Sequence, residues 1–267
     1  MMNGGKVLLA AHRGDRLLYP ENTMPAFLSA YDLGVDMIET DIHMTQDGEL
    51  IIMHDRSAQR TAGVDRNVDE MTFDEIQKLD VGYHFLEKFR GTRVPTVKEF
   101  LTWITDTDLL VNWELKDYPH LTGDDHAFAA ADRLIALVEQ YGMQERSMIN
   151  SFSVRVLEYV YKRYGKRFPI HGQGIYRCSR SNDMCETPAE ILFDWCCLYA
   201  EKTGTVPTDY RGNFNYCRQW NILPCLCIPD TIELYRTALD YGCRMFTSNN
   251  IYEADRILRL LGVRGGE

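Results

Sequence analysis

Residues 6–14 read KVLLAAHRG, and this stretch decides the fold, because a strand-like apolar run ends there on a histidine and an arginine. Similar runs recur along the chain, separated by segments whose apolar residues lie about 3.6 positions apart. Alternating strands and helices of this kind predict an α/β protein, specifically a (β/α)8 TIM barrel. The strands that we predict are residues 6–12, 37–43, 109–116, 147–152, 168–175, 197–202, 222–228 and 244–249.

The competing architecture is an open, doubly wound sheet. It is disfavoured because no G-x-G-x-x-G sequence follows the first predicted strand. The length of 267 residues is one at which α/β barrels commonly form one domain. We therefore expect a single barrel domain over residues 1–267.

Residues 56–95 interrupt the alternation. The turn QDG at 46–48 predicts a hairpin, and the residues that follow it are polar and rich in Arg, Asp and Thr. We expect a small insertion after the second strand, on one face of the barrel, with too few apolar residues for a core of its own. A cluster of ring-bearing side chains in it forms either a wall of the binding site or a small core, and clustered aromatics favour the core. Its members are Tyr83, His84, Phe85 and Phe89.

Charge and hydropathy argue against two classes of partner. The net charge of −10, with a pI of about 5.2 and no long run of Lys or Arg, argues against nucleic-acid binding. No apolar run reaches the roughly 18 residues that a membrane-spanning helix needs. The N-terminus lacks the apolar segment of a signal peptide. We expect a cytoplasmic protein without a stable membrane anchor, acting on a small molecule.

All eight cysteines lie at or after Cys178, and none forms a C-x-x-C pair. This spacing is typical neither of a zinc site nor of the disulfide framework of a small secreted protein. We expect reduced and mostly buried thiols.

Charged side chains occupy the ends of neighbouring predicted strands. Glu39 and Asp41 are two positions apart on the second strand and therefore point to the same side, and His43 continues this pattern. Glu114 and Lys116 repeat the spacing at the end of the third strand. Because the C-terminal ends of barrel strands build the active site, we expect these side chains to converge.

A single acidic residue at a strand end is usually solvated or ion-paired, and a single histidine is usually structural. Three carboxylates that point together differ, because they repel one another unless a cation lies between them. Oxygen ligands without cysteine favour a hard ion such as Mg²⁺ or Ca²⁺. Arg13 and Lys116 beside the ion would provide a place for a phosphate, and His12 and His54 suit acid–base chemistry. The pattern is compatible with metal-assisted phosphate-ester chemistry.

Six short motifs occur in order: HRG at 12–14, PENT at 20–23, GVDMIETD at 34–41, TQDG at 45–48, HD at 54–55 and WELK at 113–116. SF at 151–152 and LDYGCRMFTSNN at 239–250 follow. With these motifs the chain resembles the glycerophosphodiester phosphodiesterase family. The resemblance extends over essentially the whole chain and is dense to about residue 152.

The resemblance implies hydrolysis of a glycerophosphodiester to glycerol 3-phosphate and an alcohol, in lipid and glycerol metabolism. A neighbouring glycerol hydroxyl would attack phosphorus, and water would open the resulting cyclic phosphate. The implied roles are an acid–base pair of His12 and His54, a phosphate contact from Arg13, and a polar shell completed by Glu21 and Lys116. Glu39, Asp41 and Glu114 would hold one divalent cation, Mg²⁺ or Ca²⁺, with Mn²⁺ as a further candidate.

Two other functions are compatible with the same fold. A phospholipase-type phosphodiesterase would act on intact lipids, but no basic amphipathic helix indicates membrane binding. A non-catalytic barrel would bind a phosphate ligand, but such a protein would be expected to lose a histidine or a carboxylate. All of these residues are present here, which favours an enzyme.

Overall fold

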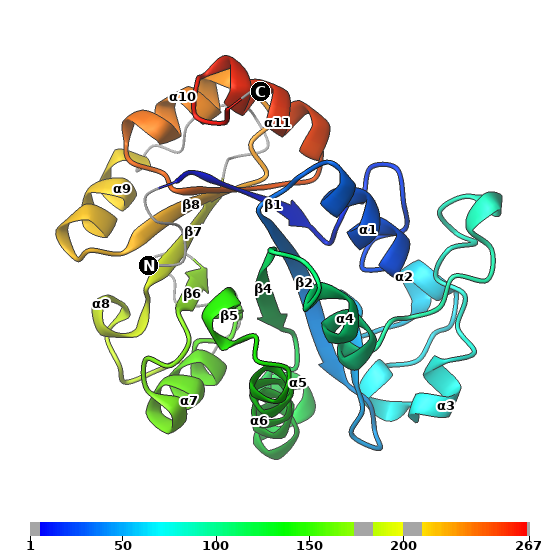
Figure 1. The fold of residues 1–267 in the computed structure, drawn as a ribbon. Coiled ribbons are helices and arrows are strands. Elements are labelled where there is room, and N and C mark those ends of the chain that lie inside the picture. Colours follow the sequence, from blue (N-terminus) through cyan, green and yellow to red (C-terminus); the bar gives the residue numbers. More distant parts are fainter. Residues whose placement is uncertain (1–5, 174–183, 200–209, 266–267) are drawn as a thin grey trace.

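A closed barrel of eight parallel strands forms the centre of the computed structural model, which describes residues 6–173, 184–199 and 210–265. The strands follow one another around the barrel in chain order, and pairing of β1 with both β2 and β9 closes it (Figure 1). The predicted TIM barrel is thus confirmed. The barrel strands are β1 (Leu8–His12), β2 (Met37–Met44), β4 (Leu110–Leu115), β5 (Ser147–Asn150), β6 (Ile170–Gln173), β7 (Trp195–Tyr199), β8 (Leu223–Cys227) and β9 (Met245–Ser248).

One difference from the predicted strand bounds is at the sixth barrel strand, β7. It begins at Trp195, two residues before the predicted start, because it pairs with His171 of β6 at that position. The predicted strand residues 174–175 and 200–202 lie outside the described part of the chain.

Helices surround the barrel and cover the outer faces of its strands (Figure 1). Their N-termini carry local signals, as in α4, where Thr96 and Glu99 form a capping box. The helices are α1 (Met24–Asp32), α4 (Val97–Ile104), α5 (Pro119–Thr122), α6 (Asp124–Gln140), α7 (Val154–Tyr164), α8 (Ala189–Leu192), α9 (Tyr210–Gln219), α10 (Ile232–Asp240) and α11 (Ile251–Leu260). A short 3₁₀ helix, η3 (Gln144–Arg146), precedes β5.

Strand alternation divides the side chains between two compartments. In β2, Ile38 and Ile42 pack outward into the large core beneath the helices, whereas Met37 points into the barrel. Glu39 and Asp41 share the parity of Met37, so they also point inward. The period of two along each strand is therefore what carries the acidic side chains into the barrel.

A hairpin follows β2, as the QDG turn predicts. The short strand β3 (Leu50–Ile52) pairs antiparallel with β2, and the insertion leaves from its end. Figure 1 shows the insertion, in cyan, to one side of the barrel near α1. Its helices are α2 (Gln59–Ala62), η1 (Val68–Glu70), α3 (Phe73–Ile76) and η2 (Glu87–Phe89).

The insertion packs around a small apolar core that it shares with the hairpin, so this core is not its own alone. The hairpin contributes Ile51 and Met53 to this core, so the insertion does not have to supply it alone. The remaining buried members are Ala58, Val68, Met71, Ile76, Leu79, Val81 and Val94.

The ring-bearing cluster is not part of that core, which corrects the favoured interpretation. The side chains of Tyr83 and His84 are exposed, and those of Phe85 and Phe89 are half-buried. Phe89 packs against Tyr19 of the loop after β1, with ring centroids 5.4 Å apart. The aromatic residues therefore face the barrel rim, because the aliphatic residues already fill the core.

Two further findings concern membranes and cysteines. Among the described residues, no helix is both long enough and apolar enough to cross a bilayer.

Cys197 and Cys227, on the adjacent strands β7 and β8, form a disulfide, which contradicts the expectation of reduced thiols throughout. Cys178 lies outside the described residues.

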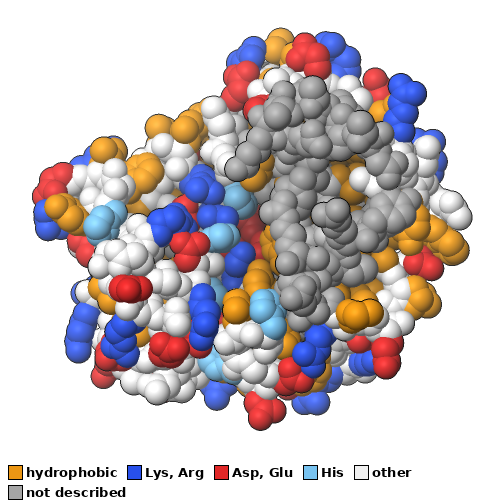
Figure 2. Space-filling model, turned by 180° about the vertical axis from the view of Figure 1, so that it is seen from behind, with side chains coloured by type: hydrophobic (Ala, Val, Ile, Leu, Met, Phe, Trp, Pro, Cys, Tyr) orange, Lys and Arg blue, Asp and Glu red, His pale blue; other side chains and the backbone are white. Residues whose placement is uncertain are grey.

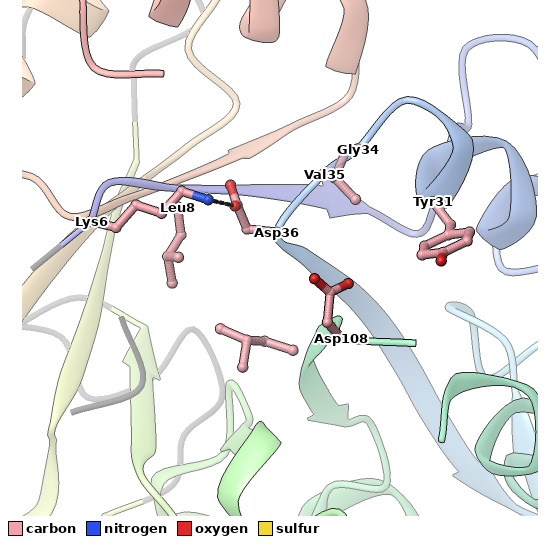
Figure 3. A pocket seen from close by; sticks show the side chains of 8 residues that line it. Lys6, Leu8, Tyr31, Gly34, Val35, Asp36 and Asp108 are labelled. Carbon is pink, nitrogen blue, oxygen red and sulfur yellow. Dashed lines mark hydrogen bonds and ion pairs between the residues drawn. The ribbon is translucent and has the colours of Figure 1, made fainter. Parts of the chain in front are cut away.

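A cavity of about 370 Å³ lies at the N-terminal end of the barrel, where β1, β2 and β4 begin (Figure 3). Asp36 accepts hydrogen bonds from the Leu9 backbone at 2.8 Å and from Lys6 at 2.5 Å, and it pairs with Arg264. Its charge is thus neutralised by neighbours in the fold. In a barrel this end serves stability, whereas the chemistry belongs to the opposite end.

Candidate active site

Three carboxylates converge inside the barrel, at the C-terminal ends of β2 and β4. Asp41 and Glu114 are register partners on these neighbouring strands, and Glu39 precedes Asp41 on the same face. One carboxylate oxygen from each of the three residues lies within 4.8 Å of the other two, and all three residues are buried. The predicted convergence is therefore present.

The carboxylates fit a divalent cation. Glu39 Oε1 and Asp41 Oδ1 are buried and have no hydrogen-bond partner, so one oxygen on each is available as a ligand. Burial, and then the charges of Asp41 and Glu114, raise the pKa of Glu39 well above its usual value. A cation would relieve this repulsion. Carboxylate oxygens are the donors that Mg²⁺ and Ca²⁺ prefer.

Two basic side chains flank the acidic group. Arg13 Nε lies 3.1 Å from Asp41 Oδ2, and Lys116 Nζ lies 2.7 Å from Glu114 Oε1 and 3.6 Å from Asp41 Oδ1. Burial opposes ionisation of Asp41, but Lys116 and Arg13 outweigh it and hold its pKa at about 2. Asp41 is therefore ionised at neutral pH.

Glu21 collects further arginines at the rim. It accepts hydrogen bonds from Arg13 at 3.0 Å, from Arg16 at 2.8 Å and from Arg60 of the insertion at 2.6 Å. Burial opposes the ionisation of Glu21, yet Arg60, Arg13 and Arg16 lower its pKa. Figure 2 shows basic, acidic and histidine side chains gathered around a hollow on this face. Arg13 also pairs with Asp41, and Arg60 with Asp55, so the three guanidinium groups are shared among three carboxylates.

His12 ends β1 and lies beside the acidic group. Its Nε2 is 3.9 Å from Glu39 Oε2, and its Nδ1 is 2.5 Å from Oδ1 of Asn249. The amide oxygen can only accept, so Nδ1 carries the proton and Nε2 is the basic nitrogen. Burial and then the charge of Arg13 lower the pKa of His12 to about 3, so the imidazole is neutral.

His54 lies just after β3. The backbone nitrogen of Met53 donates to the Asp41 carbonyl at 3.0 Å, which fixes the start of this loop beside the acidic group. His54 Nδ1 is 2.5 Å from Asp55 Oδ1, and Arg60 Nε binds the other oxygen of Asp55 at 2.5 Å. Asp55, Arg60 and Glu21 thus connect the loop of His54 to the loop of His12.

The HRG sequence needs its glycine for a steric reason. Gly14 has φ of 77°, and a Cβ there would lie 2.8 Å from the backbone of Ala26 in α1. Arg13 itself has φ of 61°, a conformation that is costly for a residue with a side chain. The tight turn holds the Arg13 guanidinium over the strand ends.

The structure also brings in residues that the sequence analysis did not select. Asn22 of the PENT motif donates to Asp41 Oδ2 at 2.8 Å. Asn249, directly after β9, positions His12, and its place after a barrel strand was the available signal. No sequence pattern indicated that Arg16 or Arg60 belongs to the site, because isolated arginines in polar loops are common. His43 instead forms a buried pair with Asp117, at 2.6 Å.

Comparison with known proteins adds a family assignment. The family model described as "Glycerophosphoryl diester phosphodiesterase family" matches residues 12–197. A protein named glycerophosphodiester phosphodiesterase from Caldanaerobacter subterraneus is 41% identical over 152 residues, which cover 55% of this chain and 59% of the relative. One of the same name from Bacillus altitudinis is 31% identical over 147 residues, covering 53% and 56%. The chain thus spans less than two thirds of the length of these relatives.

A solved structure shares the fold. A phosphodiesterase from Oleispira antarctica, in complex with the product sn-glycerol-3-phosphate, superposes with a TM-score of 0.78 at 18% identity. The superposition covers 94% of this chain and 96% of the other. The family match includes HRG, PENT, both acids of β2, HD and WELK, the segments that surround the acidic group described above. On this match, which extends over most of its length, the chain belongs to the glycerophosphoryl diester phosphodiesterase family.

Proposed function

We propose that this chain is an enzyme that hydrolyses glycerophosphodiesters to glycerol 3-phosphate and an alcohol, in a single barrel domain with the insertion at its rim. The observation that carries the proposal is the placement of three buried carboxylates together with the side chains of Arg13 and Lys116 at one end of the barrel. His12 lies beside them. The related enzyme from Oleispira antarctica was solved with sn-glycerol-3-phosphate, which supports a small-molecule substrate of this class.

Glu39, Asp41 and Glu114 would hold one divalent cation, Mg²⁺ or Ca²⁺, with Mn²⁺ as a further candidate. Such an ion supplies Lewis-acid stabilisation of the negative charge on the phosphate oxygens. Arg13 and Lys116 would bind the same phosphate, because both lie next to the carboxylates that would hold the cation. Glu21 holds Arg13 in place for that contact.

His12 is the base of the first step in this proposal. Its neutral imidazole has Nε2 unprotonated, and that nitrogen would accept the proton of the glycerol hydroxyl as the hydroxyl oxygen attacks phosphorus. His54 is the acid. Its Nδ1 lies 2.5 Å from the Asp55 carboxylate, and in this proposal its Nε2 proton would go to the departing alcohol. Their different partners, an amide and a carboxylate, are the reason for these roles.

The second step reverses the proton transfers. His54, now neutral, would take a proton from water as the water oxygen attacks phosphorus. His12, now protonated, would give its proton to the glycerol oxygen as the ring of the cyclic phosphate opens. Each histidine thus returns to its starting state, and the net reaction consumes one water.

A hydrolysis assay on glycerophosphocholine tests the proposal. We expect release of choline and glycerol 3-phosphate with added Mg²⁺, Ca²⁺ or Mn²⁺, and no release after chelation. Full activity in excess chelator would contradict the metal assignment. Binding of glycerol 3-phosphate without any turnover would instead support a non-catalytic phosphate-binding barrel.

A further inference from the structure

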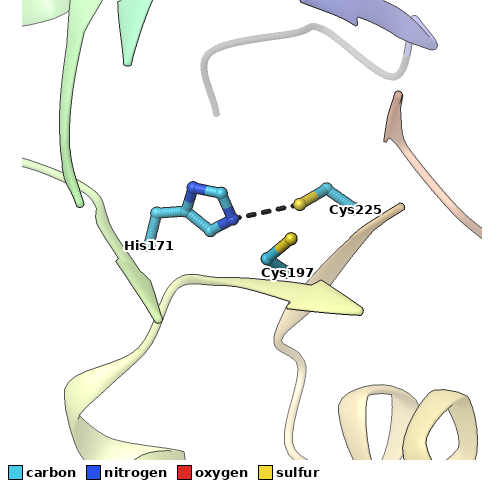
Figure 4. Close-up of side chains that lie close together, drawn as sticks. All are labelled: His171, Cys197 and Cys225. Carbon is cyan, nitrogen blue, oxygen red and sulfur yellow. Dashed lines mark hydrogen bonds between the residues drawn. The ribbon is translucent and has the colours of Figure 1, made fainter. Parts of the chain in front are cut away.

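We propose that a second metal site lies inside the barrel, with His171, Cys197, Cys225 and Cys227 as its ligands. The site takes a thiophilic divalent cation such as Zn²⁺ when the Cys197–Cys227 disulfide is reduced. Figure 4 shows the imidazole and the two sulfur atoms of His171, Cys225 and Cys197 pointing toward one another. Their ligand atoms lie within 4.8 Å of one another, and His171 Nε2 is 3.0 Å from Cys225 Sγ. The site is independent of the proposed hydrolase function.

The barrel register brings these side chains together. Cys197 and Cys225 are direct partners across β7 and β8, and both point into the barrel. His171 of β6 reaches across the interior toward Cys225. Because the three strands are adjacent and closed into the barrel wall, the ligands are held in place before any metal arrives. All three residues are buried, which excludes competing water.

The donor set matches zinc. Structural Zn²⁺ sites use four ligands from Cys and His in tetrahedral geometry, with bonds of about 2.0–2.3 Å. Cys227 is bonded to Cys197 in the disulfide and is therefore beside the site, so its thiolate would be the fourth ligand after reduction. The set would then be three Cys and one His. By contrast, the oxygen ligands Glu39, Asp41 and Glu114 form a hard site, so the two groups prefer different ions.

Asn112 provides an independent observation. Its Nδ2 lies 3.1 Å from His171 Nδ1, while its buried Oδ1 has no hydrogen-bond partner. Rotation of the amide by half a turn would exchange these atoms, so that Oδ1 accepts from an Nδ1–H. That tautomer leaves His171 Nε2 free of a proton and able to bind a metal. A hydrogen bond of this kind to the second ring nitrogen is typical of metal-bound histidine.

The metal-free disulfide and the metal-bound form interconvert through a balanced reaction. A dithiol reductant supplies two electrons and two protons to the Cys197–Cys227 bond and becomes a disulfide itself. Zn²⁺ then replaces the three thiol protons of Cys197, Cys225 and Cys227. Burial raises the pKa of the Cys225 thiol, so that thiol keeps its proton until the metal displaces it.

A small cavity adjoins both groups of ligands. A cavity of about 30 Å³ is lined by Glu39, Glu114, Asn112, His171 and Cys227, among other residues. It therefore lies between the carboxylate group and the thiol group. An ion that reaches the carboxylates from solvent has the second site next to it.

Cobalt substitution tests the proposal with the whole chain. The wild-type protein is prepared in two states, fully reduced with a phosphine and with the Cys197–Cys227 disulfide verified by alkylation and mass spectrometry. Reduced protein should bind one equivalent of Co²⁺ at the thiolate site, with a thiolate-to-cobalt charge-transfer band and the intense visible bands of a tetrahedral ion, and Zn²⁺ should displace it. Oxidised protein should show neither band. Failure of the reduced wild type to develop them would overturn the proposal, and this comparison requires no variant to fold.

Variants locate the ligands. Cys225→Ser and His171→Ala should lose the tetrahedral spectrum, and Asn112→Ala should weaken binding by roughly tenfold or more. Cys243→Ser is the matched control, because Cys243 is a buried thiol that packs in the core beneath the helices and donates to the Met245 carbonyl. Glu39→Gln should retain the thiolate band, since it changes only the carboxylate site. An unchanged band in a folded Cys225→Ser protein, checked by circular dichroism, would contradict the ligand assignment.

Discussion

At the scale of single residues, the two histidines differ in their partners. His12 binds an amide oxygen and lies beside Arg13, whereas His54 binds a carboxylate. An amide holds an imidazole in one tautomer without favouring its charged form. A carboxylate also fixes the tautomer, and in addition it places a negative charge beside the ring. The proposed division into base and acid follows from this difference.

Replacement of the histidines should abolish most turnover. His12→Ala and His54→Ala should each reduce kcat by about two to four powers of ten, because each removes a proton-transfer group. The double variant should lose much less than the product of the two effects, since the pair acts as a unit. Steady-state kinetics on glycerophosphocholine measures this. His120→Ala is the control, because His120 is exposed on α5. Near-wild-type rates in either active-site variant would show that histidine to be structural.

The pH profile should respond to Asn249. Burial and Arg13 lower the pKa of His12 to about 3, so the base stays neutral as the pH falls through the weakly acidic range. Asn249→Asp places a negative charge 2.5 Å from Nδ1 and should raise that pKa, moving the acid limb of kcat/KM to higher pH. Asn249→Ala should lower kcat without moving the limb upward. An acid limb that stays in place in Asn249→Asp would mean that His12 is not the titrating base.

Glu39 gives a metal-linked prediction. Without a cation it is repelled by Asp41 and Glu114, and with one it is a ligand. Glu39→Gln should therefore raise the unfolding midpoint in chelator, by the equivalent of about 1 kcal/mol, and weaken Mn²⁺ binding by about tenfold or more. Calorimetry measures both quantities. Glu253→Gln, at an exposed position of α11, is the control. A destabilised Glu39→Gln protein in chelator would argue that the three carboxylates do not repel one another.

At the scale of elements, the turn between β1 and α1 sets the position of Arg13. Gly14 has φ of 77° and no room for a Cβ beside Ala26, whereas Gly262 has φ of 71° with nothing within 4 Å. The two glycines share a backbone conformation, but only Gly14 lacks room for a Cβ. They therefore separate the cost of the conformation from the cost of the clash.

Alanine at these two positions should give unequal losses of stability. Gly262→Ala should cost about 1–2 kcal/mol, the penalty of a left-handed conformation. Gly14→Ala should cost that amount and about 1–3 kcal/mol more, because α1 must move away from the turn. Urea unfolding gives both values. Equal losses would mean that α1 shifts freely, and the turn would then not fix Arg13.

The insertion is the other element that shapes the site. Arg60 of α2 binds Glu21 and Asp55, and a cavity of about 180 Å³ lies beside it, lined also by His84 and Phe85. The hairpin strand β3 and the apolar core at its end hold α2 in this position. The insertion thus contributes charge and ring surface to the rim.

At the scale of the whole molecule, the parallel barrel places the C-terminal ends of its eight strands at one face. The hollow there combines a charged interior with a rim made by the β1 loop and the insertion (Figure 2). Fixed charges inside would bind the phosphate and the glycerol half of a substrate. The leaving alcohol would lie toward the rim, where fewer contacts constrain it.

Under the proposed function, the protein should accept several head groups. Glycerophosphodiesters of choline, ethanolamine and glycerol should all yield glycerol 3-phosphate, at rates within roughly a factor of one hundred, the scale that modest pocket contacts discriminate. Phosphorus NMR identifies the product. Phosphocholine with free glycerol would show cleavage on the other side of phosphorus and would contradict attack by the glycerol hydroxyl.

The sequence by itself determined what depends on local periodicity. A period of two carries Glu39 and Asp41 to one side of β2 and Glu114 to the same side of β4. Strand and helix spacing predicted the barrel, and the barrel then required these ends to meet. Each of these inferences uses residues close together in the chain.

Tertiary structure decided the contacts between distant residues. His12 meets Asn249, Cys225 meets His171, and Cys197 bonds to Cys227, across separations of 237, 54 and 30 residues. The core of the insertion likewise depends on the hairpin before it. Spacing along the chain has no information on such pairs, because closure of the barrel and the register of β6, β7 and β8 place them side by side.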